Sequence, residues 1–212
     1  LAQCVHFADG TSASADYIVC TCDASVVFDK LLGEKHNEKF FKTRFNDNYR
    51  HPVYSTFNTY IAVDDKCDSL KDTTWFNCAP YTAVGKEHDS VLLKSFSSEP
   101  KYSPEGKNLL QTLLVQYEDD FDKWARLYEG NREAYKQEKE KIAQSVLAAI
   151  EDKFPQLKGK MTVVETVSPY SYYRFCGAYK GAYMSFILTP FAPKKTHKGR
   201  LRKIKNVYLA GQ

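Results

Sequence analysis

The longest regular stretch of the sequence is NREAYKQEKEKIAQSVLAAIEDKFP, residues 131–155. Apolar side chains recur there at steps of three, four and seven residues, and Lys and Glu fill the opposite side, as in an amphipathic helix. The apolar positions are Tyr135, Ile142, Val146 and Ile150, widened by Ala143, Leu147 and Phe154. Pro155 then stops the helix, because proline has no backbone N–H and its ring clashes with the preceding turn. We therefore predict one long helix over about residues 131–154.

Strand-forming residues flank this helix. Residues 49–118 are rich in Tyr, Phe, Ile, Val and Leu, and turn-like runs of Asp, Ser, Pro and Gly interrupt them. The sequence therefore predicts an α+β fold, with a mixed or antiparallel sheet between about 49 and 168 and the long helix packed on it. Strands are expected at residues 2–7, 15–22, 161–167, 183–188 and 207–210, with a turn at Asp9-Gly10 and a short helix capped by Asp23.

Composition indicates a globular protein. The chain has 212 residues, of which 43% are hydrophobic and 26% charged, and its net charge of +4 is too small to indicate a nucleic-acid partner. No apolar run reaches the roughly 20 residues of a membrane helix. The six Cys form no C-x-x-C and no zinc set with His, so we predict buried reduced thiols, no metal site and a cytoplasmic location.

Familiar catalytic motifs are absent. The sequence has no G-x-G dinucleotide fingerprint, P-loop, H-E-x-x-H or G-x-S-x-G, and its five His are scattered. The aromatic fraction of 14% is compatible with a pocket for an apolar ligand and equally with an aromatic-rich core. The residues alone therefore assign no catalytic group.

Three segments together resemble a known family in order and spacing. They are VHFADG (5–10) with ADYIVC (15–20) and Asp23, ETVSP (165–169) with Tyr173-Arg174, and IKNVYLAGQ (204–212). They are similar to the FAD-dependent oxidoreductases of the phytoene desaturase and carotenoid isomerase group, within the amine oxidase superfamily. Ser168 replaces the usual Thr, and Met184-Ser185 replaces an aromatic–Gly pair. The resemblance covers nearly the whole chain and is vaguer between about 35 and 128.

The resemblance implies a domain arrangement. Residues 1–34 would end a Rossmann-like FAD-binding domain, residues 35–185 would form the substrate domain, and residues 186–212 would return to the FAD domain. FAD would be the cofactor, held mostly by sequence outside this chain, since the Gly-rich fingerprint would precede Leu1. The whole enzyme would desaturate, saturate or isomerise a small conjugated or isoprenoid-like apolar substrate, and the fragment alone would be inactive.

The resemblance also implies site residues. Asn206, Ala210 and Gly211 would lie near the flavin, and Pro169, Tyr173 and Arg174 would form the rim of the substrate cavity. No residue is implied as catalytic, because the cofactor carries the chemistry in such enzymes.

Other interpretations remain open at this point. Seven of the twelve residues from Lys194 to Lys205 are basic, which suits peripheral contact with an anionic membrane or simply a solvated loop. An amine-oxidase-like enzyme for a polar amine is one alternative, and a non-catalytic module that binds an anionic surface is another. Redox work by Cys20 and Cys22 is a third. Self-association through exposed apolar surface is also expected.

Overall fold

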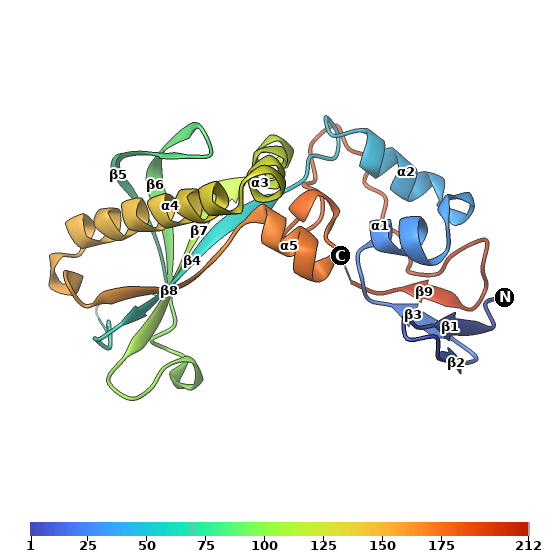
Figure 1. Ribbon diagram of the computed structural model, residues 1–212, viewed down its shortest axis with the longest axis horizontal. Helices are drawn as coiled ribbons and strands as arrows, with labels where there is room; N and C mark the ends of the chain where they lie inside the picture. The colour runs from blue at the N-terminus through green and yellow to red at the C-terminus, as the bar shows by residue number, and fades with distance from the viewer. Residues whose placement is uncertain (69, 212) are drawn as a thin grey trace. The chain divides into compact units, whose positions relative to one another are not determined.

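The computed structural model describes residues 1–68 and 70–211 (Figure 1). These residues form two compact units, which we describe separately. The sheet unit spans Ser55–Ser171. The terminal unit combines Leu1–Tyr54 with the described residues from Tyr172 onward. Segments 35–54 and 172–185 thus belong to the terminal unit, and the assignment of FAD and substrate domains stays a prediction.

An antiparallel sheet dominates the sheet unit. Its strands follow the order β5-β6-β7-β4-β8, and all neighbours are antiparallel. The strands are β4 (Ser55–Val63), β5 (Thr73–Ala83), β6 (Lys86–Ser95), β7 (Asn108–Gln116) and β8 (Met161–Val167). The predicted α+β fold is therefore confirmed. Its sheet is antiparallel throughout the described strands.

Two consecutive helices cover one face of this sheet (Figure 1). They are α3 (Glu118–Gly130) and α4 (Arg132–Lys153), and α4 confirms the predicted long helix. Asn131 separates them, and its side chain accepts hydrogen bonds from the amides of Glu133 and Ala134, both at 3.0 Å. This cap satisfies two of the amides that a helix start leaves free.

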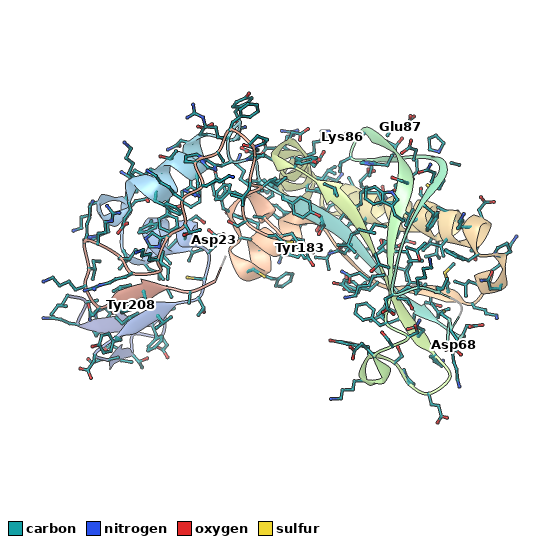
Figure 2. The ribbon with its side chains drawn as sticks, turned by 180° about the vertical axis from the view of Figure 1, so that it is seen from behind. Asp23, Asp68, Lys86, Glu87, Tyr183 and Tyr208 are labelled. Atoms are coloured by element: carbon teal, nitrogen blue, oxygen red, sulfur yellow. The ribbon has the colours of Figure 1, made fainter. Side chains whose placement is uncertain are left out.

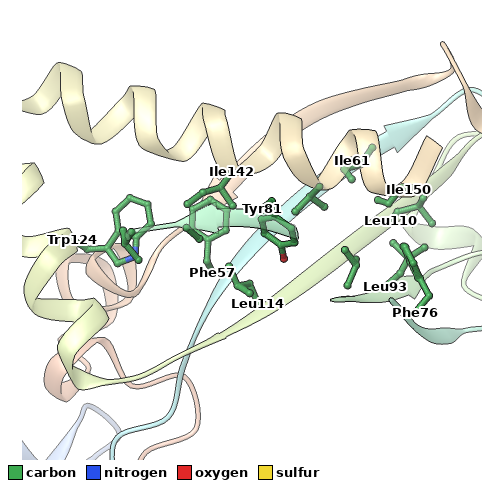
Figure 3. Close-up of a cluster of buried hydrophobic side chains, with 14 of the residues drawn as sticks. Phe57, Ile61, Phe76, Tyr81, Leu93, Leu110, Leu114, Trp124, Ile142 and Ile150 are labelled. Atoms are coloured by element: carbon green, nitrogen blue, oxygen red, sulfur yellow. The ribbon is translucent and has the colours of Figure 1, made fainter. Parts of the chain in front are cut away.

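The core of the sheet unit lies between these helices and the sheet (Figure 3). Trp124 of α3 is fully buried and stacks on Phe57 of β4, with ring centroids 5.5 Å apart. Its indole N–H donates to Gln116 Oε1 at 2.7 Å, so the ring is buried without losing a hydrogen bond. Burying a large aromatic side chain contributes about 1.5–3 kcal/mol, so Trp124 fixes α3 on the sheet.

The opposite side of β4 and β7 carries a different set of side chains. Because side chains alternate along a strand, the residues between the core positions point away from α3 and α4. We call this set the open face, and it comprises Thr56, Asn58, Tyr60, Ala62, Leu109, Gln111, Leu113 and Val115. Thr56, Asn58 and Gln111 are buried, and the other five residues are half-buried. Leu113 also pairs in register with Leu92 of β6, which extends the apolar surface.

The terminal unit brings the two ends of the chain together. Its strands are β1 (Cys4–His6), β2 (Ser12–Ser14), β3 (Ile18–Cys20) and β9 (Val207–Leu209). β1 and β2 form an antiparallel hairpin around the predicted turn at Asp9-Gly10, although no strand was expected at β2, and β3 pairs with β9 in parallel. The helices are α1 (Ala24–Val26), which continues as a π-type turn to Leu31, and α2 (Lys39–Asn46). α5 (Pro169–Cys176) begins in the sheet unit and ends in the terminal unit.

The predicted strand at 183–188 is wrong. Residues 183–187 make backbone hydrogen bonds with Pro52 and Tyr54, but only a single bridge, Val53 to Phe186, forms there. Ser185 has a φ of 62°, in the left-handed region, and this breaks the extended conformation that a strand needs.

The predicted burial of the cysteines is also largely wrong. All six are free, but only Cys67 is buried, four are half-buried and Cys176 is exposed. The expected buried strand over 15–22 is likewise shorter, with Val19 of β3 58% exposed. Short strands at a sheet margin leave such side chains accessible, which the apolar composition of the segment did not reveal.

Within the described residues, no helix is long and apolar enough to cross a bilayer.

The turn between β5 and β6 supplies a test of this fold. Val84 is buried there with a φ of 44°, a strained conformation for a β-branched residue, and its amide donates to Glu138 Oε1 of α4 at 2.7 Å. We expect Glu138→Ala to lower the free energy of unfolding by about 1–3 kcal/mol, because it leaves this amide without a partner. Urea unfolding should leave Glu133→Ala, an exposed α4 control, near wild type. Equal stability of the two variants would contradict the role of Glu138.

Candidate functional site

The parallel strands β3 and β9 end at a cavity of about 490 Å³ in the terminal unit. Ligands of open α/β sheets bind outside the carboxyl ends of parallel strands, and the volume falls within the usual range for small-molecule sites. The cavity is lined by Cys22–Ala24 after β3, Leu209–Gly211 at the end of β9, side chains of α2, and parts of segments 185–188 and 195–199.

Close backbone approach shapes the cavity wall at the end of β9. The Ala210 amide donates to Cys20 O at 2.9 Å, and Gly211 has a φ of 135°. A Cβ on Gly211 would lie 3.3 Å from Thr21 O, and a Cβ on Gly199 would lie 2.8 Å from Leu209 O. Glycine at these two positions allows the backbone segments to pack closely around the strand end.

Aromatic rings form much of the remaining wall. Phe40, Phe41 and Phe45 of α2 and Phe186 all line the cavity. The imidazole of His197 packs on this group, with its ring centroid 4.8 Å from that of Phe41. Such a wall suits a planar ring system, which can stack on or meet the edges of these rings.

Positive charge is concentrated on the same cavity. Arg44, Lys195 and Lys198 contribute to its lining. The Arg44 guanidinium lies 3.5 Å from the Phe40 ring centroid and donates to Phe40 O at 3.1 Å and Lys195 O at 2.9 Å. Burial lowers the pKa of Arg44, but an arginine remains protonated in proteins. The cavity therefore favours an anionic ligand.

Asp23 contributes a carboxylate to the lining of the cavity. Backbone amides of the protein already donate hydrogen bonds to it. Figure 2 labels this residue, at the start of α1. Its Oδ1 accepts from the Ser25 amide at 2.8 Å and its Oδ2 from the Tyr179 amide at 3.1 Å. The bond from the Ser25 amide caps the start of α1, as the sequence predicted for Asp23, and both bonds offset part of the negative charge of this carboxylate.

His51 is a cavity residue that the sequence did not single out. Its side chain is 1% exposed, and its Nε2 has no hydrogen-bond partner among the described residues. Burial lowers its pKa, with a further lowering by Arg44 and Arg50 and a raising by Asp47. Nothing in the local sequence HPVY distinguished this His from the other four, because its burial depends on residues distant in the chain.

The residues predicted to lie near a flavin occupy two places. Ala210 and Gly211 line the cavity. Asn206 is buried outside the lining, where its Oδ1 accepts from the Ala2 amide at 2.8 Å and its Nδ2 donates to Ala2 O and Asp16 O. Asn206 thus ties the N-terminal segment to β9. Gln212, the last residue of the C-terminal motif, lies outside the described residues.

The residues predicted for a substrate rim all belong to α5. Pro169 is buried at its start, Tyr173 is 44% exposed, and Arg174 is exposed with its guanidinium 5.2 Å from the Phe175 ring. None of the three lines the cavity of the terminal unit. Their role at a substrate stays a prediction.

This parallel strand pair thus carries a cationic, aromatic cavity at its carboxyl ends, which suits an anionic ligand with a planar ring system. The family model for flavin containing amine oxidoreductases matches residues 3–212. The chain belongs to this family. No curated protein matches the sequence.

Among solved structures, the chain is similar to an oxidoreductase from Methanosarcina mazei, with 10% identity and a TM-score of 0.45. The match covers 99% of this chain and 42% of that one, so this chain spans less than half of that protein's length. Within the described residues, no group of three or more His, Cys, Asp or Glu could hold a metal ion.

Glycine at position 199 provides a test of the cavity wall. We expect Gly199→Ala to destabilise the protein by about 2 kcal/mol or more, because its φ of 78° disfavours a side chain and the new Cβ would meet Leu209 O. Gly130→Ala is the matched control, since a Cβ there meets nothing within 4 Å. Thermal unfolding of both variants measures the difference, and equal melting temperatures would show that the wall tolerates a side chain.

His51 should make stability depend on pH. Its folded-state pKa is lowered, so between that pKa and the ordinary value of about 6.5 the unfolded chain binds more protons than the folded one. The free energy of unfolding should therefore fall as the pH drops below about 6.5. Urea unfolding across this range should show a smaller fall for His51→Phe than for wild type. If the free energy of unfolding of the two proteins depended on pH in the same way, the pKa of His51 would not be lowered by folding.

Proposed function

We propose that this chain is the substrate-domain part of a FAD-dependent oxidoreductase that acts on an apolar, conjugated or isoprenoid-like substrate. The observation that carries the proposal is the chemistry of the open face. None of its eight residues carries a carboxylate, and its aliphatic side chains are Ala62, Leu109, Leu113 and Val115. Such a surface can take up a hydrocarbon, and the carboxylate of Glu165, which pairs in register with Tyr60, already forms an ion pair with Lys139 at 3.6 Å.

The positive charge and the aromatic lining of the cavity in the terminal unit support a flavin nucleotide as its ligand. Gly211 would let the cofactor approach the backbone, the Phe side chains would pack on the ring system, and Lys195 and Lys198 would face its anionic groups. The flavin, when bound, supplies the capacity to accept or donate a hydride. The residues of the chain would bind it, orient it and exclude water.

If the cofactor carries the chemistry and the protein only binds and orients it, no set of catalytic acid and base residues is needed in the sequence. A cofactor that carries the chemistry needs orientation and a dry surrounding from the protein rather than a dedicated acid–base pair. On the open face, Gln111 Nε2 donates to Tyr60 Oη at 3.3 Å. That bond occupies polar groups which would otherwise disfavour an apolar ligand.

A second candidate is oxidation of a polar amine. The description of the matched family, which names amine oxidoreductases, favours it. Its requirements differ, because a cationic substrate needs carboxylates or a cage of aromatic rings. Peripheral membrane contact through residues 194–205 and self-association stay predictions. Within that segment, Lys195 and Lys198 line the cavity, so they are available to a cofactor as well as to a surface.

The first experiment is a visible spectrum of the protein expressed from the complete gene, beside the 212-residue chain. We expect flavin bands at about 370 and 450 nm in the complete protein and little flavin in the chain alone. No flavin in either sample after incubation with FAD would overturn the proposal.

A second experiment distinguishes the substrate classes. Anaerobic mixing of the flavin-loaded protein with isoprenoid polyenes or with amines should bleach the flavin bands for the polyenes only. Leu113→Asn should lower the rate for a polyene about tenfold, because it places a polar amide on the open face. Val164→Asn, on edge strand β8 and 62% exposed in the wild type, is the control. Bleaching by amines alone would replace the first candidate by the second.

A further inference from the structure

The Nε2 atom of His51, which has no hydrogen-bond partner among the described residues, is a feature of the cavity that its packing does not explain. His51 is 1% exposed and meets the Phe186 ring edge-on, with centroids 6.4 Å apart. Its backbone amide donates to Asp47 O at 2.9 Å, which places the residue without using the ring. A buried polar atom without a partner costs about 1–3 kcal/mol, and at the wall of a cavity a ligand or a water can supply the missing hydrogen bond.

The surroundings of His51 specify what kind of ligand this is. Burial lowers the pKa of the imidazole, so at neutral pH it is uncharged, with one nitrogen as donor and the other as acceptor. The neighbouring walls are aromatic, through Phe45 and Phe186, and the cavity lies at the carboxyl ends of β3 and β9. A hydrocarbon could use the rings but not the imidazole. A planar heteroaromatic ring with carbonyl and nitrogen atoms on its edge can use both.

We propose that His51 forms a hydrogen bond to the polar edge of the isoalloxazine ring of the flavin and so positions that ring in the cavity. This inference rests on the proposed function, since it needs a flavin at this site. His51 is a binding and positioning residue, and its hydrogen bond also influences the bound flavin. A donor at the ring edge stabilises the electron-rich reduced ring, which makes reduction easier.

The protein offers a matched control for this role. His36, in a 3₁₀ turn of the same unit, also has a buried ring nitrogen without a partner among the described residues, but it does not line the cavity. His51→Phe keeps an aromatic ring beside Phe186 and removes both nitrogens. His36→Phe makes the same chemical change away from the cavity. His51→Gln keeps a side-chain N–H that can donate.

The test uses the protein from the complete gene, loaded with FAD, with two readouts that do not involve turnover. Flavin fluorescence gives the dissociation constant, and equilibration with a reference dye gives the reduction potential. We expect His51→Phe to bind FAD about fivefold more weakly, as the loss of one neutral hydrogen bond implies, and to have a more negative potential. His36→Phe should match wild type in both readouts, and His51→Gln should recover part of both losses.

The outcomes separate this inference from the proposed function. If wild type binds FAD and His51→Phe matches it in affinity and potential, the His51 inference is overturned while the flavin function stands. A gain in thermal stability of His51→Phe with unchanged flavin properties would also overturn the inference, because it would show that the buried nitrogen has no partner in the loaded protein. If His51→Phe does not fold, wild-type values for His51→Ala would overturn the inference instead. Failure of the wild-type protein to bind any flavin would overturn both.

Discussion

The parallel pairing of β3 with β9 is the constraint on which the candidate site depends. Three residue pairs, from Ile18–Val207 to Cys20–Leu209, join segments near the two ends of the chain. Asn206 secures this arrangement from the side by bonding the backbone at Ala2 and Asp16. Because both strands end at the same edge, the residues that follow them meet there, and the cavity forms between them.

Local patterns determined what could be predicted. The helix at α4 had a cap at Asn131, a periodic apolar stripe and Pro155 beyond its end, so its bounds were predictable to within a residue. The helix at α3 was missed, although Phe121, Trp124 and Tyr128 have helical spacing and three acidic residues open its first turn. The strand-forming residues before α3 concealed the change from the two-residue period of a strand to the 3.6-residue period of a helix.

Long-range contacts determined what could not be predicted. Ala210 and Gly211 were named from a motif and line the cavity, but much of the remaining lining comes from α2 and from two segments without regular structure. His51 has no local signal, since its burial arises from packing against Phe186 and from the pairing of Pro52 and Tyr54 with residues 183–187. Likewise, the strand expected at 183–188 failed because of the conformation at Ser185, where the sequence shows only an apolar run.

Two chemically different surfaces follow from this organisation. In the terminal unit, cationic side chains and an uncharged His51 adjoin aromatic rings, and this combination suits a ligand that is planar, polar at its edge and anionic elsewhere. In the sheet unit, β4 and β7 place uncharged polar groups and aliphatic side chains on the open face. A flavoenzyme needs both kinds of surface, because the cofactor requires charge complementarity and an apolar substrate requires the absence of charge. A protonated amine would instead require negative charge at the substrate surface. The chemistry of the open face therefore separates the two candidate functions.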